Sequence, residues 1–219
     1  MSKLDYSIIW RNIDLLLQGL GLSLLLTVIA VGLGLAFGTV LAVMRTSTSR
    51  IAAGIAGTYV DLIRGVPLIL VIFWFFFLVP LLLGRPVGSF LSAVIAFTMF
   101  EAAYYCEIIR AGIGSVKSGQ WQASVATGLS RVQAFRYVIL PQAFRNATPV
   151  LITQSIILFQ DTSLVYVVTL RDFVTSASIV AHREFRMVEL YTFVAAVFLV
   201  ICIPASLLVQ NLKNRMTGG

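Results

Sequence analysis

The stretch LLLQGLGLSLLLTVIAVGLGLAFGTVLAVM, residues 15–44, contains no Asp, Glu, Lys or Arg over 30 consecutive positions. A helix crosses the hydrocarbon core of a bilayer with about 20 residues, each of which advances it by ~1.5 Å. This stretch is therefore long enough to span a membrane. It is also longer than the apolar core of a signal peptide, which has about 7 to 15 residues, so we expect it to remain in the protein as a helix.

Four further apolar runs follow in this chain of 219 residues. Residues 65–84 and 190–212 also lack charged side chains, whereas 86–100 and 146–160 reach spanning length only if they continue through an isolated acid. With 59% hydrophobic residues, 11% charged residues and a mean hydropathy of +0.96, the sequence predicts an all-α integral membrane protein. We expect one domain, 1–219, with a loop at 114–145 and five transmembrane helices at about 15–44, 67–83, 89–113, 149–170 and 190–212.

The net charge of +7 indicates topology rather than a nucleic-acid partner, because membrane proteins collect Lys and Arg in their cytoplasmic loops. We expect the N-terminus outside and the C-terminus inside, an orientation in which the inside loop has no acid between Glu107 and Asp161. Nine basic residues are then inside: Arg45, Arg50, Arg110, Lys117, Arg131, Arg136, Arg145, Lys213 and Arg215. Six are outside: Lys3, Arg11, Arg85, Arg171, Arg183 and Arg186.

Two short-range patterns predict contacts near the first and second spans. Gly34 and Gly38 have the small-xxx-small spacing that lets a second helix approach closely. Asp61 and Arg64 are three positions apart on an amphipathic segment, so we expect them to neutralise each other. Pro67 follows and suits the first turn of the next helix.

The fourth span and the segment after it also have recognisable boundaries. Thr148 is a candidate cap followed by Pro149 at the first helical position, so this helix is expected to begin there. Asp161 would then lie about 18 Å further along the axis, near mid-membrane. Residues 171–188 are expected to form a short helix along the outer membrane interface.

A polar, basic stretch at 121–141, WQASVATGLSRVQAFRYVILP, separates two of the apolar runs. Ser130 followed by Gln133 is a capping box, which predicts that a helix starts at the next residue after the serine. Gly128 suits the left-handed position that ends a preceding short helix at about 119–127. We therefore expect two short helices around a glycine.

The first of these helices is expected to expose Trp121 and Val125, and a compact pair of helices can fit a groove on a soluble partner. Two other interpretations are disfavoured. GIGSVKS, 112–118, has Val116 where a phosphate-binding loop needs glycine and follows no strand. A DNA-reading helix-turn-helix would need exposed base-contacting residues, but here a membrane span follows within a turn.

The pattern QAS-x3-G-x9-V-x-LP resembles the EAA loop of the permease subunits of ABC-type importers. Glutamine replaces the motif's glutamate, serine its second alanine and valine its isoleucine. The residues that carry the resemblance are Gln122, Ala123, Ser124, Gly128, Val138, Leu140 and Pro141. Four other segments resemble the polar amino-acid branch of these permeases: RGVPLIL (64–70), EIIRAGI (107–113), GLSRVQAFRYVILPQAFR (128–145) and QDTSLVYV (160–167). Two stretches, FEAAYYCEIIRAGI (100–113) and LFQDTSLVYV (158–167), look most like a glutamate/aspartate permease.

This resemblance implies a type I importer permease fold in a bacterial cytoplasmic membrane. It implies that the loop containing Trp121, together with the motif residues, docks onto a cytoplasmic dimer of ABC ATPases and transmits its movement. Further partners would be a second permease, either a related chain or another copy, and an extracytoplasmic amino-acid-binding protein. The subunit itself would hydrolyse nothing and would need no cofactor or metal. Loss of the glutamate at Gln122 removes one charge from the docking contact.

Candidate residues of the substrate path are Glu101 and Asp161, because an acid within a membrane span generally faces a polar cavity or a partner. Their carboxylates suit the amino group of the substrate, while Arg64 and Arg110 suit its carboxylates. The equally weighted alternative is that each acid forms a structural ion pair with Arg64, Arg110 or a residue of another chain. Glu107 and Arg110 are expected to pair with each other.

Three other functions compete with ATP-driven import. An ion-coupled secondary amino-acid transporter would have similar helices but would work without an ATPase. A membrane enzyme is disfavoured, because the inside loops lack clustered His, Asp, Glu or Cys. Cys106 and Cys202 lie within expected spans and form no CxxC motif, and His182 is expected to be solvated. A structural membrane adaptor is the third possibility.

Overall fold

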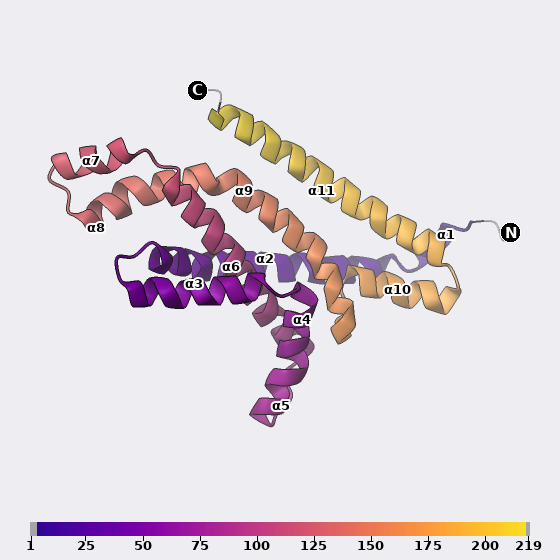
Figure 1. The fold of residues 1–219 in the computed structure, drawn as a ribbon. Coiled ribbons are helices and arrows are strands. Elements are labelled where there is room, and N and C mark those ends of the chain that lie inside the picture. The colour runs from indigo at the N-terminus through magenta and orange to yellow at the C-terminus, as the bar shows by residue number, and fades with distance from the viewer. Residues whose placement is uncertain (1–3, 218–219) are drawn as a thin grey trace.

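The computed structural model describes residues 4–217, with side chains as far as residue 214, and its elements are all helices (Figure 1). Four helical segments are long and apolar enough to cross a membrane, and a bent pair would make a fifth span. The expected all-α membrane fold is confirmed, with the second of the five spans broken. The elements are α1 (Ser7–Arg11), α2 (Ile13–Arg45), α3 (Arg50–Arg64), α4 (Leu68–Phe73), η1 (Trp74–Leu78), α5 (Val79–Leu83), α6 (Ser89–Gly114), α7 (Ser118–Ala126), α8 (Arg131–Ala134), η2 (Phe135–Ile139), α9 (Leu140–Asp161), η3 (Thr162–Val168), α10 (Phe173–Glu184) and α11 (Met187–Thr217).

Helices α2 and α6 form the central pair of the fold. A Cβ added at Gly38 would lie 2.8 Å from the carbonyl oxygen of Ala102, and one added at Gly34 would lie 3.0 Å from the Cβ of Glu101. The absent side chains therefore let the two helices approach closely, and the prediction made from their spacing is confirmed. One face of α2 is buried at helical spacing: Leu16, Gly19, Ser23, Leu26, Ala30, Gly34, Gly38 and Leu41.

The second span is bent where α3 meets the segment formed by α4, η1 and α5. The axes of the two parts differ by 104°. Pro67 is the N-cap of α4 rather than a residue of its first turn. Proline disfavours a helical conformation of the residue before it, which explains why α3 ends at Arg64. The tip of the segment is an α5 turn that closes on Gly84 in a left-handed conformation.

The fourth span begins earlier than the sequence indicates. It was expected at 149–170, but α8, η2 and α9 run on without a break from residue 131 to Asp161. Pro149 lies buried inside α9, and Thr148 is no cap, because Pro141 occupies the first turn instead. An internal proline removes one backbone hydrogen bond, which this long helix tolerates. Beyond Asp161 the chain tightens into the 3₁₀-helix η3.

The short helix expected at 171–188 is α10. Asp172 caps it, because its carboxylate accepts hydrogen bonds from the backbone amides of Val174 at 3.0 Å and Thr175 at 2.9 Å. Helix α10 packs against α1, α2 and α11 in an apolar cluster that includes Ile9, Leu16, Phe173, Val180 and Leu190. The N-terminal part of the chain and α10 therefore lie together at one end of the molecule.

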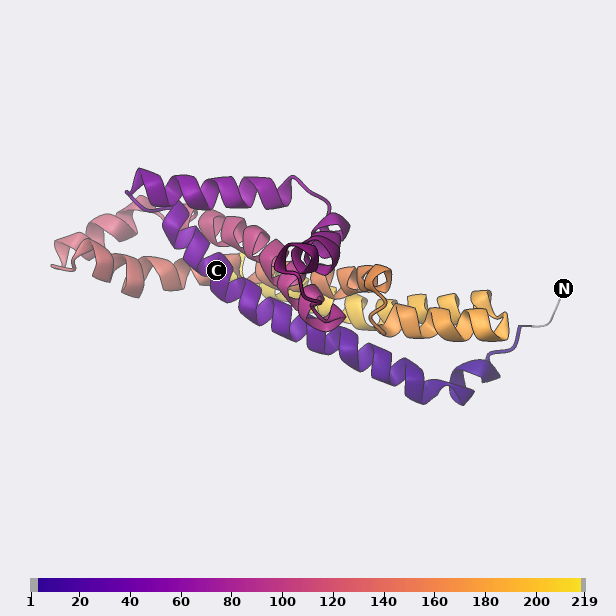
Figure 2. The same ribbon diagram turned by 90° about the horizontal axis from the view of Figure 1, so that it is seen from below.

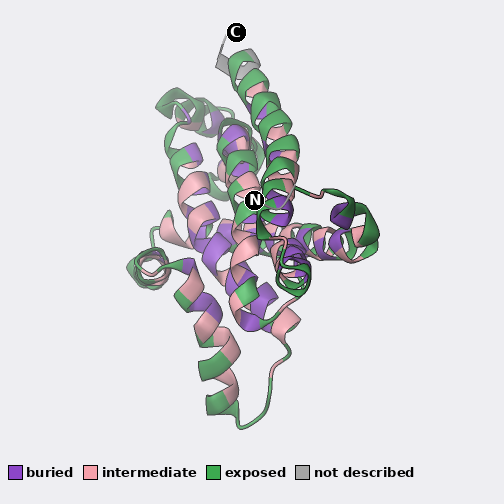
Figure 3. Cartoon of the chain, turned by 90° about the vertical axis from the view of Figure 1, so that its right-hand side faces the viewer, coloured by how far each residue is buried: buried purple, intermediate pink, exposed green. Residues whose placement is uncertain are grey.

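Burial decreases from the middle of the fold to its periphery (Figure 3). In α6 the most apolar 18-residue window is 56% buried, compared with 17% in α11. The spanning helices thus pack around α6, whereas most apolar side chains of α11 are not buried within the chain.

Candidate functional site

A hairpin made of α7, a glycine turn and α8 lies at the opposite extremity from α10 (Figures 1 and 2). Gly128 has a φ of +85°, a left-handed conformation that glycine adopts without strain. Its amide donates to the oxygen of Val125 at 3.0 Å, and the amide of Leu129 donates to that of Ser124 at 3.2 Å. These two bonds close the C-terminus of a helix, so the predicted turn is confirmed.

A capping box fixes the start of α8. The amide of Gln133 donates to Ser130 Oγ at 3.3 Å, and the amide of Ser130 donates to Gln133 Oε1 at 2.9 Å. Each residue thus satisfies a backbone donor that the helix itself leaves unpaired. Both ends of the turn are closed by hydrogen bonds, which makes the α7–α8 hairpin a well-defined unit.

The interior of the hairpin contains Trp121, which the sequence predicts to be exposed. Its ring instead stacks on Phe135 with 6.2 Å between centroids and is only partly accessible. Ser124 is also buried, and its hydroxyl donates to the oxygen of Gln120 at 2.6 Å. The expectation for Trp121 is therefore wrong in part, because a large aromatic ring is stabilised more by packing against η2 than by contact with water.

Two valines are exposed on the outer surface of the hairpin. Val132 is 75% exposed and Val125 is 52% exposed. Both residues, with Gln122, line an open cavity of about 1030 Å³ that is also lined by Val43 and the loop at 46–48. Val125 was expected to be exposed, whereas the exposure of Val132 was not predicted.

Leu140 and Pro141 connect the hairpin directly to the membrane span. They begin α9 immediately after η2, a single π-helical turn at Phe135–Ile139. π-turns are uncommon and often occur at functional sites. The second helix of the hairpin, α8, and the fourth span are thus one continuous helical element rather than a loop followed by a helix.

A cluster of charged side chains joins α2, α3 and α6 near the hairpin end. Glu107 contacts Arg45 at 2.7 Å, Arg110 at 2.8 Å and Arg64 at 3.8 Å. The expected pair of Glu107 and Arg110 is confirmed. The expected pair of Asp61 with Arg64 is wrong, because Asp61 contacts Arg45 at 3.2 Å and Arg64 turns to α6.

The ring of Tyr104 offers Arg64 a further contact on α6. The guanidinium carbon lies 5.2 Å from the ring centroid, a distance at which a cation is attracted to the aromatic face. The contacts of Arg64 with α6 therefore outweigh the ion pair with Asp61 that the i, i+3 spacing would allow.

Glu101 is fully buried two turns further into the span. Gln154 of α9 donates to its Oε1 at 3.2 Å, while Oε2 is buried without a hydrogen-bond partner among the described residues. Gln154 is the partner that sequence reasoning missed, although its amide in an otherwise apolar run was a usable signal. An unsatisfied buried carboxylate oxygen is costly, which makes Glu101 a candidate for contact with a ligand or another chain.

Asp161 is half-buried and is the last residue of α9, where η3 begins. Glu101 and Arg110 are nine positions apart on α6, which corresponds to about 14 Å along the axis. The structure therefore places Arg64 and Arg110 together around Glu107 and separates them from Glu101.

The described part of the chain also contains two cysteines and one histidine. No group of three or more His, Cys, Asp or Glu that could hold a metal occurs there. Cys106 and Cys202 are buried as free thiols in α6 and α11. His182 is exposed and contacts the oxygen of Ser178 at 2.8 Å within α10.

Comparison with known proteins identifies relatives over nearly the whole chain. Residues 30–218 match the family described as "Binding-protein-dependent transport system inner membrane component". The glutamate/aspartate import permease protein GltK of Escherichia coli O6:H1 is 46% identical, over 98% of this chain and 99% of its own. The glutamine transport system permease protein GlnP of E. coli K12 is 32% identical, over 98% of each chain.

Solved structures agree with this fold. A chain of an amino acid ABC transporter, crystallised with histidines, matches with a TM-score of 0.89 and 30% identity over 97% of this chain and 99% of its own. A chain of the MetNI methionine ABC transporter in an inward-facing conformation matches with a TM-score of 0.65 and 17% identity, over 97% of this chain and 99% of its own. The second likeness concerns the fold alone.

Proposed function

The chain belongs to the family of binding-protein-dependent transport system inner membrane components, and from this premise we propose that it is a transmembrane subunit of an ATP-driven importer of glutamate and aspartate. The identity with the glutamate/aspartate permease is higher than with the glutamine permease over the same length, which favours the dicarboxylic substrates. ATP hydrolysis belongs to separate subunits, and an amino-acid-binding protein delivers the substrate.

The observation that carries this proposal is the α7–α8 hairpin. Both ends of its turn are closed by hydrogen bonds, it projects at one extremity, and it continues directly into a membrane span. A partner that grips such a unit moves the span attached to it. A generic basic loop would need neither a capping box nor a left-handed glycine.

Within the hairpin the motif residues have two roles in this proposal. Trp121 and Ser124 pack inside and hold its shape, while Gln122 and Ala123 are exposed and contact the ATPase dimer. Gly128 sets the turn. The last two, Leu140 and Pro141, join the hairpin to α9. Because Gln122 is neutral, the exposed Arg131 beside it supplies charge for the same contact.

For the substrate path we propose Glu101 and Asp161 near the middle and outer end, with Arg64 and Arg110 nearer the cytoplasm. Glu101 has one carboxylate oxygen without a described partner, which supports contact with a substrate ammonium group. Arg64 and Arg110 already contact Glu107, so a substrate carboxylate would share them with that residue.

The proposed assembly contains a second permease, either a related chain or another copy, in a bacterial inner membrane. The whole chain, 1–219, acts as one permease domain. The N-terminal end lies with α10 and the C-terminal end of α11 lies towards the hairpin side (Figure 1), which supports an external N-terminus and a cytoplasmic C-terminus. Lys3 and the side chain of Arg215, which entered the charge count, lie outside the described residues.

Reconstitution with the ATPase, the partner permease and the binding protein tests the proposal. We expect ATP-driven uptake of labelled glutamate and aspartate, and loss of uptake in Gly128→Asp, because a side chain at φ +85° is strained. Gly119→Asp is the matched control: it adds the same charge to α7, where a Cβ meets nothing within 4 Å. Normal uptake by Gly128→Asp would disprove the coupling role of the hairpin. Uptake that does not depend on ATP would favour an ion-coupled secondary transporter.

A further inference from the structure

The α7–α8 hairpin is joined to its two neighbouring spans in different ways. On one side, α8, η2 and α9 continue without a break from residue 131 to Asp161. On the other side, α6 ends at Gly114 and α7 begins at Ser118, so residues 115–117 between them belong to no helix. A few residues at the end of an element are where a chain absorbs a bend. The connection to α6 is therefore a joint, at which a movement of the hairpin is lost unless another contact bridges it.

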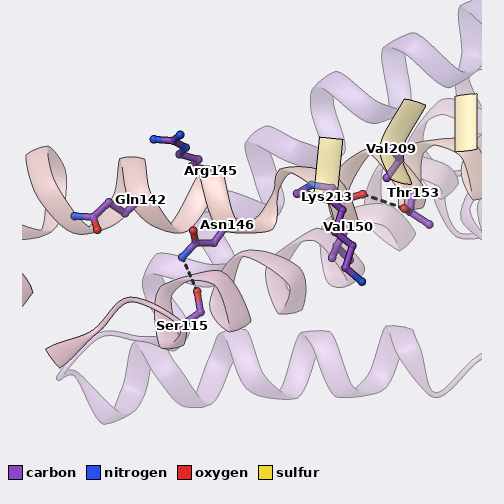
Figure 4. Close-up of a pocket in the computed structure, with 9 residues that line it drawn as sticks. Ser115, Gln142, Arg145, Asn146, Val150, Thr153, Val209 and Lys213 are labelled. Atoms are coloured by element: carbon purple, nitrogen blue, oxygen red, sulfur yellow. Dashed lines mark hydrogen bonds between the residues drawn. The ribbon is translucent and has the colours of Figure 1, made fainter. Parts of the chain in front are cut away.

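Asn146 of α9 bridges this joint. Its Nδ2 donates to Ser115 Oγ at 2.9 Å, and Figure 4 shows the Asn146 side chain pointing to Ser115. Ser115 Oγ in turn donates to the carbonyl oxygen of Gly112, in the last turn of α6, at 2.7 Å. Because the hydroxyl proton is used for that bond, the hydroxyl oxygen accepts from the asparagine amide. Asn146 is thereby tied to α6 through a residue of the joint itself.

Two further contacts hold the same joint against α9. One turn closer to the hairpin, Gln142 Nε2 donates to Gln120 Oε1 of α7 at 3.3 Å. Val116, the middle residue of the joint, packs in an apolar cluster with Ile139 and Ala143. The start of α9 thus contacts the joint and α7 through both polar and apolar side chains.

Helices α6 and α9 stay in contact from the joint towards the middle of both helices. A Cβ added at Gly112 would lie 2.6 Å from the carbonyl oxygen of Ala143, so the two backbones approach closely there. Further along, the hydroxyls of Tyr105 and Ser155 form a hydrogen bond of 3.0 Å, and Gln154 forms its bond to α6 beside them. The two helices therefore form a stem to which the hairpin is attached.

We propose that Asn146 is a positioning residue for transport: its bond to Ser115 makes α6 move together with α9 when the ATPase dimer moves the hairpin. The inference rests on the proposed function. Without the bond the joint at 115–117 bends, and the movement reaches α9 alone. ATP is then still hydrolysed, but the two spans no longer move as a unit, and fewer amino-acid molecules are imported for each ATP.

Uptake of labelled glutamate and hydrolysis of ATP, measured in the same proteoliposomes with the complete transporter and the binding protein, test this role. We expect Asn146→Ala and Ser115→Ala each to hydrolyse ATP as wild type does. Each should import about two- to tenfold less glutamate per ATP, the effect of losing one hydrogen bond. The double variant should lose no more than either single variant, because both substitutions remove the same bond.

Asn211→Ala is the matched control. It makes the same change at an exposed residue of α11 whose side chain forms no hydrogen bond with a described residue. This variant should import as much glutamate per ATP as wild type, because α11 does not contribute to the joint.

Four results would overturn the inference. The first is an unchanged ratio of glutamate to ATP in Asn146→Ala. The second is a loss in Asn146→Ala without one in Ser115→Ala, which would mean that the amide contacts the substrate itself. The third is additive loss in the double variant, which would mean that the two residues act separately. The fourth is an equal fall of hydrolysis and uptake, which would mean that the bond only stabilises the fold.

The same preparations separate this inference from the proposed function. Wild type that imports glutamate with ATP, together with variants of unchanged ratio, refutes the positioning role of Asn146 alone. Absence of ATP-driven uptake of any amino acid by wild type refutes the proposed function.

Discussion

Replacement of Gly38 by alanine should push α2 and α6 apart. The new Cβ would lie 2.8 Å from the carbonyl oxygen of Ala102 and 2.8 Å from the Cβ of Tyr105, whereas ordinary contact begins near 3.4 Å. The helices must therefore separate by about 0.6 Å, and overpacking of this kind costs about 1–3 kcal/mol. Neither neighbour is the flexible end of a side chain, so local adjustment relieves little of the strain.

Gly32→Ala provides the matched control, because a Cβ at Gly32 meets nothing within 4 Å on the same helix. Both variants gain the same ~0.5–1 kcal/mol of helix propensity, so the difference between them isolates the contact with α6. Unfolding in mixed micelles with increasing SDS should show Gly38→Ala less stable than Gly32→Ala by about 1–3 kcal/mol. Equal midpoints would refute the close approach of the two helices.

Three further outcomes are expected. Ser130→Ala should destabilise the start of α8 by about 1 kcal/mol, seen as faster hydrogen exchange at Gln133, and unchanged exchange would contradict the capping box. Glu107→Gln should lower the unfolding midpoint more than Asp61→Asn does. The side chain of Glu107 is 17% exposed and contacts three arginines, whereas that of Asp61 is 69% exposed and contacts one, and an exposed ion pair contributes only ~0–1 kcal/mol. A larger effect of Asp61→Asn would disprove this. Burial raises the pKa of Asp172 despite its hydrogen bonds from the start of α10, so the folded state binds its proton more tightly than the unfolded state does. The protection factors in α10, which compare exchange with that of an unfolded peptide at the same pH, should therefore rise as the pH falls through that raised pKa, and Asp172→Asn should remove this rise.

The amino-acid sequence was sufficient to predict the spans and the hairpin, because both depend on local signals. Ser130 with Gln133 and the left-handed Gly128 act within a few residues of themselves, and the apolar runs need no partner to be recognised. The start of the fourth span was misjudged for the same reason. Pro149 has the local pattern of a helix start, but the preceding turn is stabilised by packing of Ile139 and Ala143 against Val116.

Contacts between distant segments could not be predicted from the sequence. Arg64 is closest in sequence to Asp61, yet it pairs with Glu107 on another helix. Gln154 gave a polar signal without indicating that Glu101 would receive its hydrogen bond.

Because α8, η2 and α9 form one unbroken helix, a movement of the hairpin is transmitted to the far end of α9. The 31 residues of this helix, 131 to 161, extend over about 46 Å, so a tilt of about 5° displaces one end by about 4 Å relative to the other. Such a displacement is comparable to one helical turn. A small rotation of the hairpin end is therefore sufficient to displace Gln160 at the opposite end of the helix, and the π-turn before Pro141 is the place where bending would absorb part of that movement.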